Sequence, residues 1–172
     1  MSSSSNFPPI VFTDIDGVWT DGGMYYDQTG NEMKLFNTGD SAGVLFARKM
    51  GAEVVILTGE DTQIVARRAE KLKIKELHQG VKDKLGIARQ IAERLGVDLA
   101  DCAYIGDDFI DIELLREVKW SAAPQNAPDY VKNEVKYITS TPGGKGAFRE
   151  FVESMLEQTI GLDDFLNQHI IK

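Results

Sequence analysis

Acidic side chains gather at two places in this sequence, and their spacing is typical of metal-assisted phosphate chemistry. Asp14 and Asp16 are separated by one residue, and Asp107 and Asp108 are followed closely by Asp111. Crowded carboxylates repel one another and shift each other's pKa values unless a cation holds them. Oxygen ligands with open positions suit Mg²⁺, which keeps water and substrate phosphate in its coordination shell. The acidic groups therefore predict a Mg²⁺ site that accepts a phosphate.

A hydroxyl and an ammonium complete this set. Thr58, followed by Gly59, can donate a hydrogen bond to a phosphate oxygen, and Lys84 can supply a fixed positive charge, although Lys82 lies nearby. The chain needs such local positive groups because its formal net charge is −8. That charge argues against nucleic acid or an anionic membrane as the main partner and favours a small anionic substrate held by the metal.

The apolar pattern indicates how these residues meet. Short apolar runs at residues 10–13, 53–57 and 102–105 each precede one of the polar groups, and helical patterns lie between them. Strands that alternate with helices predict a three-layer, Rossmann-like α/β fold with a mainly parallel sheet. Ligands bind at the carboxyl ends of such strands, so the polar groups are expected to converge on one rim.

The other elements fit one domain over residues 10–160. Residues 24–27 and 32–36 flank a turn and predict a hairpin flap within about 22–36, followed by a helix over 40–50. Residues 76–78, 118–121 and 137–139 are further strand candidates, and 147–156 a closing helix. Residues 1–9 are expected to be a disordered tail and 161–172 a second tail. Without a signal-peptide pattern or a long apolar run, the expected location is cytoplasmic.

Four segments, in order, resemble the motifs of the haloacid dehalogenase superfamily of phosphatases. They are residues 14–22 (DIDGVWTDG), Thr58-Gly59, Lys84 and residues 106–111 (GDDFID). The resemblance implies that Asp14 is a nucleophile forming an aspartyl-phosphate and that Asp16 is the general acid and base. Thr58, Gly59 and Lys84 would bind the phosphoryl oxygens.

The same resemblance implies the ligands of Mg²⁺. They would be Asp14, the backbone carbonyl of Asp16, and Asp107, while Asp108 or Asp111 would hold these ligands in place.

The spacing leaves no room for a cap domain. The stretches between the motifs are occupied by the hairpin, two helices and one strand. Residues 15–43, which include Thr38, resemble the capless 3-deoxy-D-manno-octulosonate 8-phosphate phosphatases. That resemblance implies a homotetramer assembled through the flaps. It also implies a glycine-rich tail, Gly143, Gly144, Lys145 and Gly146, that reaches a neighbouring subunit's site, and a substrate role for Thr38.

One position departs from this pattern. Octulosonate phosphatases usually carry Arg after the Thr-Gly pair, whereas this chain has Glu60. Glu60, Arg68 and Lys71 resemble the substrate-binding residues of relatives that act on nine-carbon 2-keto acids. We therefore expect a 9-phosphate of 2-keto-3-deoxy-nonulosonate or N-acetylneuraminate, with octulosonate 8-phosphate as the alternative. A phospho-accepting signalling module and a catalytically idle regulatory subunit are the other classes. The order of the motifs and the presence of Asp16 disfavour the first, and the intact motifs disfavour the second.

Overall fold

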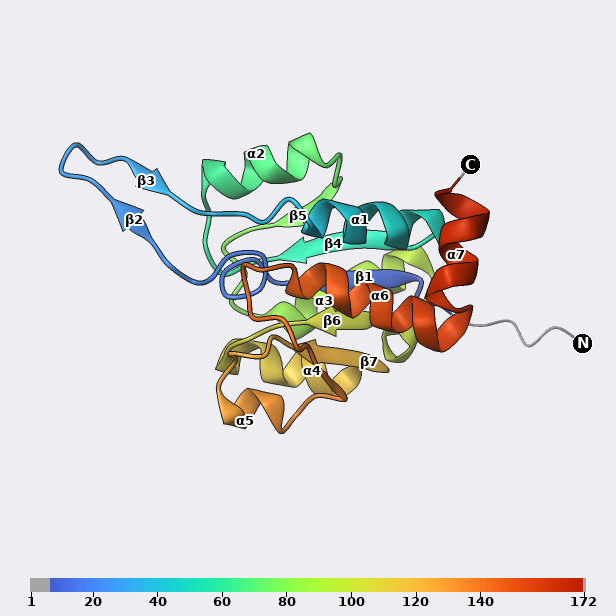
Figure 1. Cartoon of the computed structure of the whole chain (residues 1–172). Coiled ribbons are helices and arrows are strands. Elements are labelled where there is room, and N and C mark those ends of the chain that lie inside the picture. Colours follow the sequence, from blue (N-terminus) through green and yellow to red (C-terminus); the bar gives the residue numbers. More distant parts are fainter. Residues whose placement is uncertain (1–6, 172) are drawn as a thin grey trace, which may run out of the picture.

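Short, buried apolar runs form the core of a six-stranded sheet. The computed structural model describes residues 7–171, and all strand pairings in this sheet are parallel, in the order β5-β4-β1-β6-β7-β8 (Figure 1). The strands are β1 (Ile10–Thr13), β4 (Glu53–Leu57), β5 (Glu76–His78), β6 (Ala103–Ile105), β7 (Trp120–Ala123) and β8 (Tyr137–Ile138). Central strands covered on both faces read as continuous apolar runs, as β1 and β4 do.

Helices cover both faces of the sheet, as the sequence predicts. α1 (Asp40–Lys49), α2 (Gln63–Lys71) and α6 (Ala147–Thr159) contribute to one apolar core. α3 (Lys84–Leu95), α4 (Ile112–Glu117) and α5 (Asp129–Lys132) contribute to the other. Short 3₁₀ turns, η1 (Leu99–Asp101) and η2 (Phe109–Asp111), flank β6 in the chain.

Local signals set the start of α3, the helix that carries Lys84. Asp83 caps it by accepting a hydrogen bond from the Gly86 N–H at 2.7 Å, and Gly96 ends it in the left-handed conformation. A side-chain acceptor at the N-cap satisfies a backbone donor that the helix leaves free, which fixes where the helix begins. Lys84 therefore occupies the first helical position, close to the end of the preceding loop.

The two ends of the chain differ from the predicted tails. Residues 162–169 form α7 (Leu162–His169), whose Phe165 is fully buried with its ring centroid 5.2 Å from that of Phe46. The prediction of a tail over 161–172 is therefore wrong for this helix, because Phe165 packs into the apolar core beside Phe46 of α1. Of the predicted N-terminal tail, residues 1–6 lie outside the described residues. Phe7 packs against the core, and the carbonyl of Pro9 accepts a hydrogen bond from Glu53 N–H.

A hairpin projects beyond the carboxyl ends of the strands (Figure 1). Its strands, β2 (Tyr25–Tyr26) and β3 (Glu32–Met33), are antiparallel and shorter than predicted. The carboxylate of Asp27 organises the turn by accepting the backbone N–H groups of Thr29 and Asn31 at 2.8 and 3.0 Å. A two-stranded ribbon without a third strand has little to hold its ends together, which explains the short ladder. The hairpin and α1 fill the connection from β1 to β4, so no cap domain is present there.

Candidate active site

The sheet register brings the ends of three strands to one rim. Thr13 of β1 lies opposite Ile56 of β4 on one side and Ile105 of β6 on the other. The residues that follow these strands, Asp14, Thr58 and Asp107, therefore emerge at the same edge. Asp14 is 6% exposed and Thr58 is 1% exposed. This convergence is the one predicted from the strand pattern.

A coiled loop after Asp14 turns the chain back across this rim. The Trp19 indole N–H donates to the Thr13 hydroxyl at 2.8 Å, and its ring lies 5.0 Å from that of Phe148. The Thr20 hydroxyl accepts the Gly17 N–H at 3.3 Å and lies 3.4 Å from an Asp16 oxygen. These contacts hold Asp16 beside Asp14 at the mouth of the site.

Lys84 is the buried cation of the site. It is 1% exposed, and its ammonium lies 2.9 Å from Asp14 Oδ2 and 2.6 Å from Asp111 Oδ1. The Tyr104 hydroxyl, 3.2 Å from the ammonium, also donates to Asp111. Lys82 is exposed, so the structure favours Lys84 between the two lysines. The sequence did not predict Tyr104, because it lies within an apolar strand pattern and its hydroxyl function depends on tertiary contacts.

Asp111 supports the acidic cluster from within. Its Oδ2 accepts the backbone N–H groups of Asp107 and Asp108 at 2.9 and 3.0 Å, and its Oδ1 is engaged by Lys84 and Tyr104. Both oxygens are thus already used. Asp108 is exposed and caps η2 by accepting the Phe109 N–H at 2.7 Å, so its observed contacts are structural.

Asp107 has the properties of a metal ligand. Its Oδ1 is buried and has no hydrogen-bond partner among the described residues, and carboxylate oxygens of Asp14, Asp107 and Asp111 lie within 4.8 Å of one another. Close approach of Asp107 requires a glycine at position 17, because a Cβ there would lie 1.9 Å from Asp107 Oδ2. A buried carboxylate oxygen without a partner is costly unless something binds it, and an oxygen-preferring cation fits.

The electrostatics agree with this reading. Burial, with the nearby Asp111 charge, raises the pKa of Asp14 to about 7, and Lys84 opposes the rise. Burial and the charge of Asp14 raise the pKa of Asp107 to about 8. A dication placed between these carboxyls would favour their ionised forms. The donor set therefore fits Mg²⁺, with Asp14 and Asp107 as side-chain ligands.

A second cationic side chain lies at the mouth of the site. The Lys34 ammonium, carried by the flap, is 2.8 Å from each oxygen of Asp16 and 2.6 Å from Glu60 Oε2. The sequence did not predict Lys34, because nothing local indicates that the hairpin folds back over the Asp16 loop.

The other residues predicted to bind substrate, Arg68, Lys71 and Thr38, do not contact the acidic cluster among the described contacts. The Arg68 guanidinium donates to the carbonyl of Asn37 at 3.2 Å and lies over the Phe36 ring, and its buried Nε has no partner among the described residues. Arg68 thus lies at the base of the flap. Lys71 and Thr38 are exposed, and the described contacts do not join either of them to the acidic cluster.

The glycine-rich segment, residues 143–146, approaches the loop that carries Asp16. Gly144 N–H donates to the Val18 carbonyl at 3.0 Å, and a Cβ on Gly143 would lie 1.8 Å from the Gly17 carbonyl oxygen. That this segment reaches a neighbouring subunit's site stays a prediction for Gly143 and Gly144. They pack against the Asp16 loop of their own chain. Gly146 precedes α6 directly, and only Lys145 is exposed in this segment.

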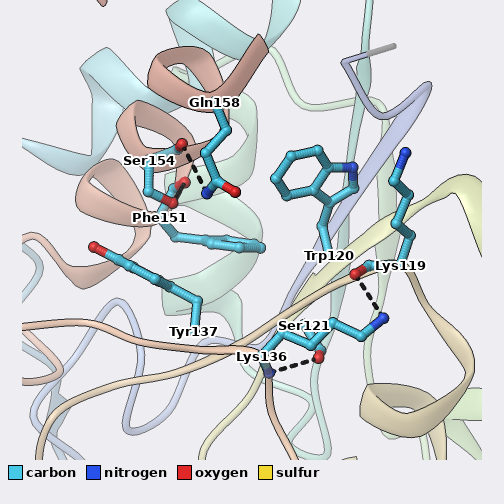
Figure 2. A pocket seen from close by; sticks show the side chains of 8 residues that line it. All are labelled: Lys119, Trp120, Ser121, Lys136, Tyr137, Phe151, Ser154 and Gln158. Atoms are coloured by element: carbon cyan, nitrogen blue, oxygen red, sulfur yellow. Dashed lines mark hydrogen bonds between the residues drawn. The ribbon is translucent and has the colours of Figure 1, made fainter. Parts of the chain in front are cut away.

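A separate hollow of about 320 Å³ lies at the amino-terminal ends of β7 and β8, against α6. Figure 2 shows the rings of Trp120, Tyr137 and Phe151 around it. The Lys136 ammonium donates to the Lys119 carbonyl, and the Gln158 amide donates to the Ser154 carbonyl. The Trp120 indole N–H has no hydrogen-bond partner among the described residues. The lining contains no carboxylate, whereas the acidic cluster lies at the opposite end of the sheet.

Comparison with known proteins agrees with the site. The family model of haloacid dehalogenase-like hydrolases matches residues 61–149. The chain is 39% identical over 148 residues to 3-deoxy-D-manno-octulosonate 8-phosphate phosphatase of Haemophilus influenzae, covering 86% of this chain and 82% of that protein. It is 34% identical to the Escherichia coli K12 enzyme of the same name, covering 94% of this chain and 86% of that protein.

Solved structures of the same kind of enzyme resemble this chain in both sequence and fold. The Moraxella catarrhalis 3-deoxy-D-manno-octulosonate 8-phosphate phosphatase, in complex with magnesium ion, phosphate ion and KDO, is 33% identical with a TM-score of 0.90, covering 96% of this chain and 95% of that one. The cobalt-bound Haemophilus influenzae enzyme is 37% identical with a TM-score of 0.84, and the match covers 91% of each chain. Among residues 7–171, no helix has the length and apolar character needed to cross a membrane. The chain is a phosphatase that belongs to the haloacid dehalogenase-like hydrolases and, within them, to the 3-deoxy-D-manno-octulosonate 8-phosphate phosphatase family.

Proposed function

We propose that this enzyme removes the terminal phosphate of a 2-keto-3-deoxy sugar acid, with 3-deoxy-D-manno-octulosonate 8-phosphate as the first candidate. The observation that carries the proposal is the buried Asp14, in contact with Lys84 and close to the unpartnered oxygen of Asp107. The names of the relatives support the eight-carbon substrate over the nine-carbon one favoured by the sequence.

The first half of the reaction uses Asp14 as nucleophile. A carboxylate oxygen of Asp14 attacks phosphorus, the bond from phosphorus to the sugar oxygen breaks, and Asp16 gives a proton to the departing alkoxide. Lys84, which already contacts Asp14, offsets charge on the transferring group together with the Thr58 hydroxyl. When bound, the metal polarises the phosphoryl group and offsets its charge.

The second half regenerates the nucleophile. Asp16, now ionised, accepts a proton from a water molecule, and the oxygen of that water attacks phosphorus of the aspartyl-phosphate. The bond from phosphorus to Asp14 breaks, which releases inorganic phosphate and restores both carboxyl groups. Asp16 therefore acts as a general acid in the first half of the reaction and as a general base in the second.

A nine-carbon substrate is the second candidate, and the placement of Glu60 favours it. Its carboxylate lies at the mouth of the site, where Lys34 connects it to Asp16. A carboxylate there accepts hydrogen bonds from sugar hydroxyls, whereas a guanidinium would attract the carboxylate of a shorter acid.

A phosphate-release assay with Mg²⁺ tests both candidates. We expect the unmodified enzyme to show its highest kcat/KM on the octulosonate ester. We expect Glu60→Arg to lower the nine-to-eight-carbon ratio of kcat/KM by about tenfold, the effect of roughly one charge-assisted hydrogen bond. The neighbouring exposed carboxylate variant Asp61→Arg is the matched control. An unchanged ratio in Glu60→Arg would remove Glu60 as the selector, and a nine-carbon optimum in the unmodified enzyme would reverse the order of the candidates.

We propose further that the flaps join subunits into a homotetramer. Tyr25, Tyr26, Met33 and Leu35 are 49%, 69%, 60% and 55% exposed on this hairpin. A hairpin of this size is marginal in water unless its apolar side chains are covered. We expect light scattering to give the mass of four chains, and Met33→Glu to shift it to smaller species. Lys49→Glu, on the exposed end of α1, is the control. A single-chain mass for the unmodified protein contradicts this assembly.

A further inference from the structure

Lys34 occupies a position that the proposed reaction does not yet use. It follows β3 directly, and its side chain is fully covered by its surroundings, although it belongs to an otherwise exposed flap. Its ammonium contacts both oxygens of Asp16 at 2.8 Å and one oxygen of Glu60 at 2.6 Å. The flap is thus fixed to the proposed general acid and base by one side chain.

We propose that Lys34 is a positioning residue, which orients the Asp16 carboxyl group towards the leaving oxygen of the substrate. The inference rests on the proposed role of Asp16. The Asp16 side chain is 28% exposed, and its other described side-chain contact is the Thr20 hydroxyl at 3.4 Å. That single long hydrogen bond leaves the carboxyl plane free to rotate. Two short contacts from one ammonium remove this freedom.

Loss of Lys34 is expected to affect the reaction rate much more than the stability of the fold. An ion pair whose carboxylates remain partly exposed contributes about 0–1 kcal/mol to folding, so loss of Lys34 hardly changes stability. A misplacement of about 1 Å in a reacting group can cost about a hundredfold in rate. General acid catalysis itself contributes about 10²–10⁴-fold. Lys34 therefore acts mainly on rate, through Asp16.

The position of Lys34 also concerns the substrate. The leaving oxygen must lie within hydrogen-bond reach of Asp16, so the adjoining carbons of the sugar pass beside Lys34 and Glu60. Because Lys34 belongs to the flap, its contact with Asp16 is present only while the flap packs over the site. A flap displaced from the site takes the orienting contact away with it.

The test compares two leaving groups. A sugar alkoxide needs a proton from Asp16, whereas the p-nitrophenolate released from p-nitrophenyl phosphate is stable without one. We expect Lys34→Met to lower kcat/KM for octulosonate 8-phosphate by about 10–100-fold, mostly through kcat, and that for p-nitrophenyl phosphate by less than about threefold. The ratio kcat/KM reports phosphoryl transfer and not the later attack of water. Lys34→Arg should recover part of the loss, because it retains a cation.

Control variants separate the possible failures. Asp16→Asn should show the same substrate selectivity with a larger loss, and Lys82→Met, at an exposed lysine, should match the unmodified enzyme. If Asp16→Asn lowers both substrates equally, the proposed role of Asp16 fails. If Asp16→Asn is selective but Lys34→Met lowers both equally or neither, only the inference about Lys34 fails. Lys34→Gln, which keeps a donor without the charge, replaces Lys34→Met should the latter lower the melting temperature, and the same outcomes apply to it.

Discussion

Asp14→Asn is expected to lower phosphate release by about 10⁴-fold or more, because the amide cannot form the aspartyl-phosphate. The fold should survive. Burial already raises the pKa of Asp14 to about 7, so an ionised Asp14 destabilises the metal-free protein and a neutral side chain of the same shape does not. Lys84 keeps its ion pair with Asp111 in this variant. The melting temperature without metal should therefore equal or exceed that of the unmodified enzyme.

The measurement pairs a phosphate-release assay in Mg²⁺ with thermal unfolding in a chelator. Asp101→Asn, at an exposed carboxylate remote from the site, is the control and should keep full activity. Rapid acid quenching of the unmodified enzyme during turnover should trap a phosphorylated peptide that contains residue 14. Retained activity in Asp14→Asn, above about 1% of the unmodified rate, would falsify the assignment of the nucleophile.

Lys84→Met is expected to have the largest effect on stability, a loss of about 3–5 kcal/mol. The Lys84 side chain is buried, and its ammonium offsets the charges of two buried carboxyl groups. Its removal leaves those carboxylates without a counterion. Activity should also fall, because the transferring phosphoryl group loses its fixed cation.

The loss should depend on pH, with a definite sign. Without Lys84, the pKa of Asp14 moves further above its already raised value of about 7, and the folded variant binds a proton that the unfolded chain has released. The stability of the unmodified enzyme already falls as pH rises from about 5 to 7, and that of the variant continues to fall above pH 7, so the loss caused by Lys84→Met grows between about pH 7 and 8. Urea unfolding at both ends of this range, in a chelator, measures the difference. Lys82→Met, at a nearby exposed lysine, should show no such loss of unfolding free energy. An equal, small loss in both variants contradicts the proposed role of the buried ammonium.

Part of this site follows from the sequence because it depends on local pattern and simple topology. A buried apolar run before Asp14, another before Thr58 and a third before Asp107 place three polar groups at one rim once the strands are parallel. The cap at Asp83 fixes the start of α3 and therefore the position of Lys84. Each of these signals lies within a few residues of the group that it positions.

The rest depends on contacts between distant segments. Lys34 is separated from Glu60 by the flap base, α1 and β4, and only the direction of the hairpin brings them together. Burial of Phe165 requires a socket beside Phe46, which no short pattern reveals. The sequence showed that residues 143–146 are rich in glycine but could not show which backbone they approach. The approach to Gly17 is a property of the complete fold.

The contact between Gly143 and the Gly17 carbonyl also has a consequence for biosynthesis. The nucleophile is translated near the start of the chain, but the backbone that braces its loop is translated much later, together with Phe148, which packs against Trp19. A nascent chain halted before residue 143 carries Asp14 and Asp16 without this brace. We therefore expect phosphatase activity to appear only late in synthesis, once residues 143–148 have left the ribosome and packed against the loop that follows Asp14.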